Sequence, residues 1–226
     1  MQAILEEYLP NVMEIPDEFI EATQETIYMT VYTSLIAGIF GLIFGILLVV
    51  TRPGGILEQR VFFNILDQIV NIVRSIPFII LLALLVTVTR FIVGTSIGAT
   101  AALVPLIVGV VPFYARQVEV ALLEVDPGVV EAAEAMGTSP IGIIFRVYLR
   151  EGLPGIIRVS ALSIINVISL TAMAGAVGAG GLGNLAVTRG YNRFQTDVTW
   201  VALIIILIVV FISQAISNWL IRKVSH

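Results

Sequence analysis

The chain has 226 residues, of which 58% are hydrophobic and 12% are charged, and its formal net charge is −4 at pH 7. A soluble domain of this length cannot bury so much apolar surface, so the bilayer is its expected solvent, and the negative charge argues against a nucleic-acid partner. The chain has no cysteine and its one histidine is His226, so we expect no disulfide, no metal site and no cofactor.

The first 26 residues contain seven acidic side chains and no Lys or Arg. A cleavable signal peptide begins with a basic region, so this segment is not one, and the first apolar run should remain in the protein. We therefore expect residues 1–26 to form an N-terminal segment and residues 27–226 to form one transmembrane domain.

Five apolar runs follow, and a helix that crosses a bilayer needs about 20 such residues. They cover roughly residues 27–50, 61–88, 97–115, 153–175 and 199–220. The sequence thus predicts an all-α integral membrane protein with about five transmembrane helices.

The first two runs contain features that bear on packing. Gly41 and Gly45 have the spacing of a close helix–helix contact, and plain packing is the favoured interpretation. The second run should bend at Pro77, because proline lacks the N–H that a helix interior needs. Asp67 and Arg74 lie two helical turns apart in this run, and we expect them to form a structural ion pair.

Lys and Arg are distributed unevenly between the loops on the two sides of the membrane. With five spans the termini lie on opposite sides, and loops on the cytoplasmic side carry the excess of Lys and Arg. We therefore expect the N-terminus and residues 1–26 outside, the C-terminus inside, and a large cytoplasmic loop over residues 116–152. The expected cytoplasmic set is Arg52, Arg60, Arg116, Arg146, Arg150, Arg158, Arg222 and Lys223, and the opposite set is Arg90, Arg189 and Arg193.

The cytoplasmic loop should contain two short helices. Asp126 is a good N-cap, Pro127 suits the first helical position, and Gly137 suits the left-handed turn that ends a helix. A second helix should begin at Ser139-Pro140. Two short helices that meet at a glycine form a protrusion that fits a groove on a soluble partner.

Glu131, Ala132 and Ala133, followed by Gly137, resemble the signature of bacterial ABC-importer permeases. In that family the loop is the coupling segment that docks on the ATPase subunit. The resemblance implies that the alanines permit close approach, that Glu131 offers a charge to the partner, and that Gly137 makes the elbow. The chain departs from the family pattern at Arg150, where a proline is usual. An idle surface helix is the alternative.

Two sequence patterns bear on nucleotide binding. The chain has no G-x-x-x-x-G-K-[ST], and its only lysine is Lys223, so the ATPase should be a separate chain. The segment GAGGLG, residues 178–183, matches G-x-G-x-x-G but follows a predicted membrane span rather than a strand, so we expect no dinucleotide site.

The wider stretch TAMAGAVGAGGLGNLAVTRGYNRFQTDV, together with NIVRSIPFIILL at 71–82 and VGTSIG at 93–98, resembles the permeases of methionine importers. The resemblance covers essentially the whole chain after residue 25. It implies the type I importer permease fold in a bacterial cytoplasmic membrane. It also implies a homodimer around a pathway, two ATP-binding-cassette ATPase subunits, an extracytoplasmic binding protein and a small amino acid as substrate. A permease for another small amino acid or a betaine-type osmolyte is the alternative.

Candidate pathway residues lie in the fourth predicted span. At 100° per residue, Asn166, Ser169 and Met173 fall within a sector of about 60°. Polar groups at membrane depth face protein or water, so we expect these three to line the pathway. The flexible thioether of Met173 suits a gate on the two-fold axis, although filling a gap in the dimer core is an equal alternative. The Gly/Ala run that follows, AGAVGAGG at residues 174–181, suits either an external gate or static packing.

Two other classes of function receive less support from the sequence. An intramembrane enzyme needs a buried nucleophile with a base or paired acids, and Asp67 is the only acid in the core of a predicted span. A standalone secondary transporter would favour inverted repeats and buried ionisable relays, and the sequence has neither.

Overall fold

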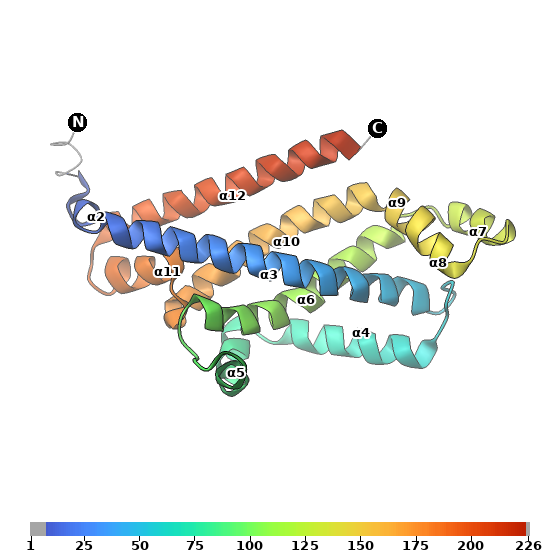
Figure 1. Cartoon of the computed structure of the whole chain (residues 1–226), viewed down its shortest axis with the longest axis horizontal. Helices are drawn as coiled ribbons and strands as arrows, with labels where there is room; N and C mark the ends of the chain where they lie inside the picture. The colour runs from blue at the N-terminus through green and yellow to red at the C-terminus, as the bar shows by residue number, and fades with distance from the viewer. Residues whose placement is uncertain (1–7, 225–226) are drawn as a thin grey trace. The chain divides into compact units, whose positions relative to one another are not determined.

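Residues 8–224 are described in a computed structural model of the chain (Figure 1). This part of the chain is helical, with no strand among residues 8–224, so the predicted all-α class is confirmed. The first seven residues of the predicted N-terminal segment, and His226, lie outside the described residues.

The elements follow one another with short connections. Three of them are wider π-helical stretches that continue a neighbouring α-helix: η1 Ile144–Tyr148, η2 Gly175–Ala179 and η3 Ala186–Tyr191. The α-helices are α2 Pro10–Glu14, α3 Pro16–Thr51, α4 Arg60–Ser75, α5 Phe78–Val93, α6 Ala99–Leu123, α7 Pro127–Ala135, α8 Pro140–Ile143, α9 Leu149–Glu151, α10 Leu153–Ala174, α11 Gly181–Leu185 and α12 Thr196–Val224.

Four helices within residues 8–224 are long and apolar enough to cross a bilayer: α3, α6, α10 with η2, and α12. The pair α4 and α5 makes a fifth span if counted together, with a bend of 107° at the break between them. Ile76 is extended there (φ −80°, ψ 122°), as expected of a residue that precedes a proline. The bend at Pro77 is therefore confirmed, and the prediction of about five spans agrees with the four long helices and this bent pair.

Two helices extend beyond the predicted spans. α3 begins at Pro16, so residues 16–26 are helical and continuous with the first span. α6 continues to Leu123, so Arg116 and Glu119 belong to a helix rather than to a loop. The helix accommodates these charges because they lie three residues apart and pair with each other at 2.6 Å.

The chain divides into two compact units, which are described separately. The first unit contains residues 1–34, 77–107 and 164–213. Within it the start of α3 lies beside α11 (Figure 1). Its two buried clusters are Phe19, Ala22, Leu182, Leu185, Val198 and Ala202, and Met29, Ala102, Leu106, Ala174 and Ala179.

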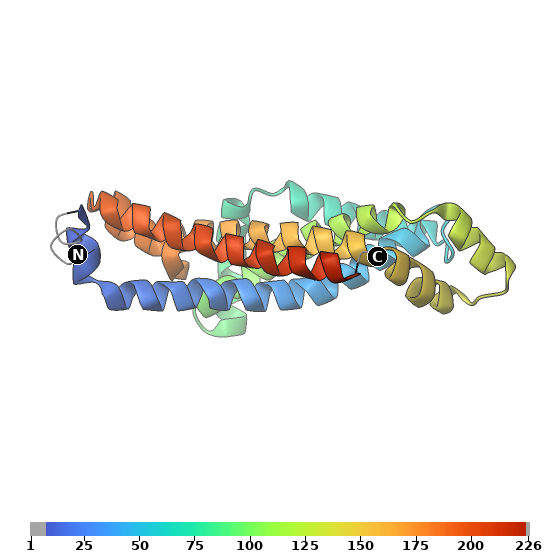
Figure 2. The ribbon, with the colours of Figure 1, turned by 90° about the horizontal axis from the view of Figure 1, so that it is seen from above.

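The second unit contains residues 35–76, 108–163 and 214–226. Gly41 and Gly45 bring α3 against α6 there: a Cβ at these positions would lie 2.8 Å from a ring carbon of Tyr114 and 2.6 Å from Cγ1 of Val118. The packing interpretation of this glycine pair is confirmed. Figure 2 shows α7 and α8 as the tip of this unit, beyond the ends of α6 and α10.

Candidate functional site

The predicted docking element forms two helices, each with a side-chain cap at its start. The carboxylate of Asp126 accepts a hydrogen bond from the Gly128 N–H at 2.8 Å, and Pro127 follows as the first residue of α7. The hydroxyl of Ser139 accepts one from the Gly142 N–H at 3.2 Å, at the start of α8. Both predicted helix starts are confirmed.

The elbow between the two helices is a backbone structure. Gly137 has φ +74°, a conformation that costs about 1–2 kcal/mol for a residue with a Cβ. Its N–H bonds to the Glu134 carbonyl at 2.9 Å, and the N–H of Thr138 bonds to the Ala133 carbonyl at 3.0 Å. These two bonds close the last turn of α7 and fix the direction in which the chain leaves it.

The four residues predicted to couple to a partner lie on different faces of this element. Ala133 is 5% exposed and packs into the core of the second unit with Val130. Glu131 and Ala132 are exposed, as is Gly137 at the elbow. Ala133 therefore brings α7 close to its own chain, whereas Glu131 and Ala132 are available to a partner.

One exposed side of α7 is apolar, next to the exposed Glu131. Val129, Ala132 and Met136 follow the spacing i, i+3, i+7 that places residues on one helix face, and Met136 is 79% exposed. Ile141 and Phe145, beyond the elbow, are 67% and 65% exposed. Exposed apolar side chains therefore lie on both sides of the elbow.

The predicted pathway residues point away from the core of the first unit. Met173 is 42% exposed and Ser169 is exposed, whereas the neighbouring Val167 is 1% exposed. The hydroxyl of Ser169 donates to the Ile165 carbonyl at 3.1 Å. The Asn166 side chain is partly exposed and has no hydrogen-bond partner within residues 8–224. This sector of α10 is thus open to whatever lies outside the protomer.

The Gly/Ala run packs backbone against backbone. A Cβ on Gly183 would lie 2.3 Å from the Ala172 carbonyl oxygen, and one on Gly175 would lie 2.5 Å from the Asn184 nitrogen. These distances are too short for any side chain, so α10 and α11 meet only because both positions are glycine. Static packing accounts for these two glycines, and GAGGLG connects two helices.

α3 caps the start of α11, a contact that sequence reasoning missed. The carboxylate of Glu25 accepts a hydrogen bond from the Gly181 N–H at 2.6 Å, and the hydroxyl of Thr26 accepts one from the Leu182 N–H at 2.9 Å. Gly180 leaves room for this carboxylate, because a Cβ there would lie 2.3 Å from it. The residues are far apart in the chain, so no local pattern signals the contact.

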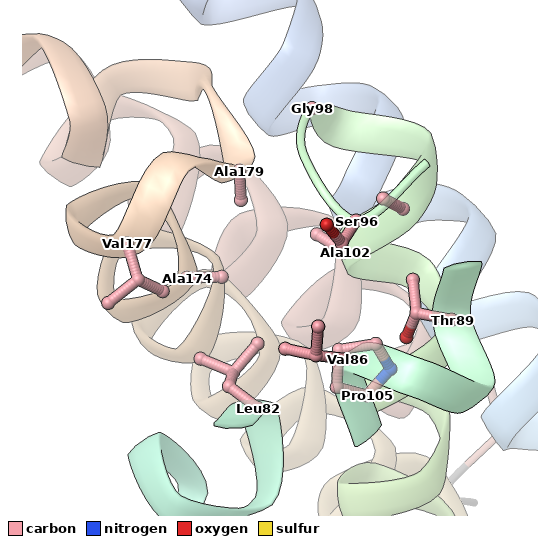
Figure 3. A pocket seen from close by; sticks show the side chains of 11 residues that line it. Leu82, Val86, Thr89, Ser96, Gly98, Ala102, Pro105, Ala174, Val177 and Ala179 are labelled. Atoms are coloured by element: carbon pink, nitrogen blue, oxygen red, sulfur yellow. The ribbon is translucent and has the colours of Figure 1, made fainter. Parts of the chain in front are cut away.

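The Gly/Ala run also borders a small pocket of about 30 Å³, which is room for about one water molecule (Figure 3). Val177, Ala174 and Ala179 form one side of it, and Leu82 and Val86 of α5 face them. The run therefore packs tightly on α11 and leaves free volume toward α5.

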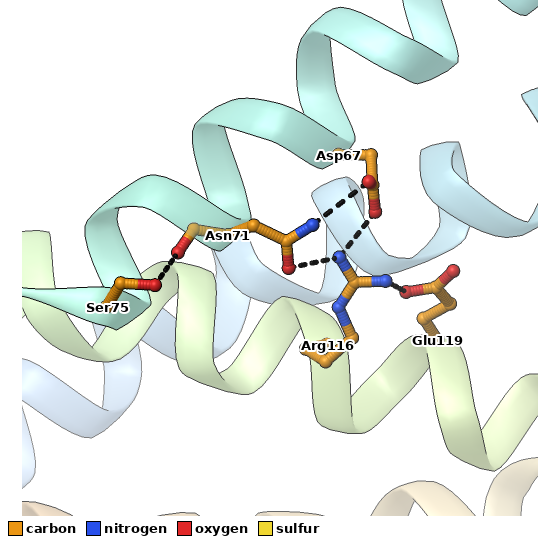
Figure 4. Close-up of polar contacts among 5 residues, drawn as sticks. All are labelled: Asp67, Asn71, Ser75, Arg116 and Glu119. Atoms are coloured by element: carbon orange, nitrogen blue, oxygen red, sulfur yellow. Dashed lines mark hydrogen bonds and ion pairs between the residues drawn. The ribbon is translucent and has the colours of Figure 1, made fainter.

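A partly buried ionic network joins α4 to α6 in the second unit (Figure 4). The Arg116 guanidinium donates to Asp67 at 2.5 Å, to Asn71 at 3.0 Å and to Glu119 at 2.6 Å. The Asn71 amide also donates to Asp67 at 3.0 Å. The network gives α4 a polar attachment to α6, beside Val70, which is the one fully buried residue of α4.

The predicted ion pair between Asp67 and Arg74 is wrong. Seven residues along a helix separate the two positions by about 10 Å, whereas Arg116 reaches Asp67 from the neighbouring helix. Arg74 is exposed and belongs to none of the ion pairs within residues 8–224. The sequence offered the alternative partner, but only the packing of α6 on α4 selects it.

Comparisons with known proteins agree with this architecture. "Methionine import system permease protein MetP" of Bacillus subtilis is 47% identical over 95% of this chain and 96% of its own length. "Probable D-methionine transport system permease protein MetI" of Pasteurella multocida is 45% identical over 91% of this chain and 94% of its own. A structure described as "Inward facing conformations of the MetNI methionine ABC transporter" matches with a TM-score of 0.90 at 42% identity, covering 92% of this chain and 97% of that one.

The family model described as "Binding-protein-dependent transport system inner membrane component" matches residues 41–226. Together with the apolar spans, this match identifies a multi-pass membrane protein. The resemblance drawn from the sequence motifs is confirmed, and the chain belongs to the family of binding-protein-dependent transport system inner membrane components.

Proposed function

We propose that the chain is the membrane-spanning subunit of an ATP-driven ABC importer that takes up methionine, and that two copies form the translocation pathway. The observation that carries the proposal is the match to the methionine transporter structure at a TM-score of 0.90 and 42% identity. Relatives named for methionine transport are 41–47% identical over more than nine-tenths of the chain, which favours methionine over a betaine-type osmolyte.

The protein would lie in the bacterial cytoplasmic membrane with its N-terminus outside and its C-terminus in the cytoplasm. The support is the asymmetry of Lys and Arg between the two sets of loops. This orientation places α7 and α8 in the cytoplasm, where ATP is available to a separate ATPase subunit.

The apolar face of α7 would dock in a groove of that ATPase. Ala132 lies in the middle of this face, and Glu131 lies beside it to pair with a cation of the partner. Val130 and Ala133, about a quarter turn around α7 from this face, pack in the same core as residues of α6 and α10. A movement of the ATPase would therefore reach both membrane helices through packed side chains.

An extracytoplasmic binding protein would deliver the amino acid, as the description of the family implies. Asn166, Ser169 and Met173 would line the pathway between the two copies. Their support is that the sector is uncovered within the protomer, so a second copy or the substrate can meet it. ATP-driven closure of the two ATPase subunits would alternate the pathway between outward-open and inward-open forms.

Uptake by the reconstituted complex tests the proposal. Proteoliposomes containing the permease, its ATPase and its binding protein should accumulate labelled methionine only with ATP, and should leave labelled betaine outside. Glu131→Lys should abolish uptake while the permease still inserts in the membrane. Accumulation of a different amino acid or of betaine, without methionine, would overturn the assignment of substrate.

A further inference from the structure

α4 has two chemically different faces. Polar residues recur along it at spacings of i, i+4, i+7 and i+11, and at 100° per residue they fall within an arc of about 60°. We call Asn64, Gln68, Asn71 and Ser75 the polar stripe. The exposed apolar residues occupy the adjoining arc of the helix: Val61, Phe62, Ile65, Ile69 and Ile72.

Both faces of α4 are uncovered within the protomer. Asn64, Gln68 and Ser75 are exposed, and on the apolar face Ile65 and Ile69 are 57% and 54% exposed. The helix packs on the rest of its unit through a third side, which carries Asp67, the buried Val70 and the partly buried Phe63, Leu66 and Val73. Two different environments must therefore meet the two faces.

The bilayer can cover only one of these faces. Lipid chains solvate the isoleucine face, but a primary amide in hydrocarbon without a hydrogen-bond partner costs several kcal/mol. The side chains of Asn64 and Gln68 have no hydrogen bond within residues 8–224, and the Ser75 hydroxyl bonds only to the Asn71 carbonyl, at 2.8 Å. Water on this side of α4 would satisfy all of them.

The stripe itself contains no charged side chain, and the exposed Arg74 lies about 60° from Asn71 around the same helix. Asn71 is its link to the ionic network, where Asp67 and Glu119 surround the Arg116 guanidinium. The remaining groups are amides and a hydroxyl, which donate and accept hydrogen bonds without strong attraction to either sign of charge. Such a surface suits a zwitterion, which must pass without being held by its ammonium or its carboxylate.

We infer that the polar stripe of α4 lines the water-filled passage and offers transient hydrogen bonds to the amino and carboxylate groups of a passing amino acid. The inference rests on the proposed transport function and names a wall of its pathway. A membrane-surface position, with the stripe facing lipid headgroups, is the competing arrangement and is separated by the experiment.

Single cysteines test the inference directly, because the natural chain contains none. Asn64→Cys, Gln68→Cys and Ser75→Cys would be compared with Ile65→Cys and Ile69→Cys, which lie at similar positions along the same helix. The full complex in lipid nanodiscs, with both membrane surfaces accessible, would be treated with a charged methanethiosulfonate reagent. Stripe cysteines should react at least tenfold faster than the isoleucine positions, and equal rates would overturn the inference.

Trapping the complex with ATP and vanadate separates a passage from a membrane surface. Closure of the inner opening should slow the reaction of the stripe cysteines several-fold, and a rate that trapping leaves unchanged would place the stripe at the headgroups. Gln68→Ala should change the KM for methionine uptake several-fold, whereas Ile69→Ala should leave it unchanged. Methionine uptake by the unmodified complex, measured in parallel, separates a failure of this inference from a failure of the proposed transport function. If it imports methionine and the stripe is unreactive, only this inference fails; if it imports none, the proposed function fails.

Discussion

Arg116→Met should destabilise the second unit far more than the loss of a surface charge. The Arg116 side chain is 21% exposed and holds two carboxylates, and removing it leaves Glu119, 8% exposed in its side chain, without its hydrogen-bonded cation. Removing one partner of a buried ion pair costs about 3–5 kcal/mol. Because the Asp67 side chain is 28% exposed, water offsets part of this cost, and we expect about 3 kcal/mol. For a chain of this size that corresponds to a decrease in melting temperature of about 6–12 °C.

Thermal unfolding of the purified complex in detergent measures this effect. Arg60→Met is the matched control, since Arg60 lies on α4, the helix that Arg116 contacts, but pairs with Glu58 at the surface, where its side chain is 73% exposed. Such a pair contributes about 0–1 kcal/mol, so this variant should unfold within about 4 °C of the unmodified protein. Combining Arg116→Met with Asp67→Asn and Glu119→Gln should recover most of the loss, because no charge is left unpaired. Equal melting temperatures for Arg116→Met and Arg60→Met would refute this reasoning.

Ala132→Trp should abolish uptake because the permease no longer binds its ATPase, which co-purification measures. Ala132→Ser should retain both uptake and ATPase binding. Normal ATPase binding by the tryptophan variant would contradict the proposed docking face. Met173→Cys should cross-link between protomers in the resting state and less in the nucleotide-trapped state, whereas Val167→Cys, buried in its own protomer, should not cross-link. The opposite result would assign Met173 to packing. A tag before residue 1 should react with an impermeant reagent in intact cells, and a tag after His226 only after lysis. The reverse pattern would invert the proposed orientation.

Features set by local chemistry could be predicted from the sequence. The spans follow from runs of apolar residues, because a helix in lipid must present such side chains for its whole length. The break at Pro77 and the caps at Asp126 and Ser139 follow because each depends on the residue itself and on backbone atoms within three positions. The elbow at Gly137 follows because few residues other than glycine adopt its conformation without strain.

The tertiary structure decided which distant groups meet. Asp67 had cations available at several positions, and only the packing of α6 on α4 selects Arg116 over Arg74. Ala133 belongs to the same motif as Ala132, yet it is buried in the core while its neighbour is exposed.

The cap that Glu25 provides to α11 joins residues more than 150 positions apart. The helical periodicity of the polar stripe of α4 can be recognised in the sequence. Whether these side chains are exposed depends on how the neighbouring helices pack, and their function depends on that exposure. The sequence by itself therefore determined the helices, their breaks and their caps, because these interactions lie within a few residues along the chain. Pairing and exposure were left to the fold, because they depend on which helices pack together in three dimensions.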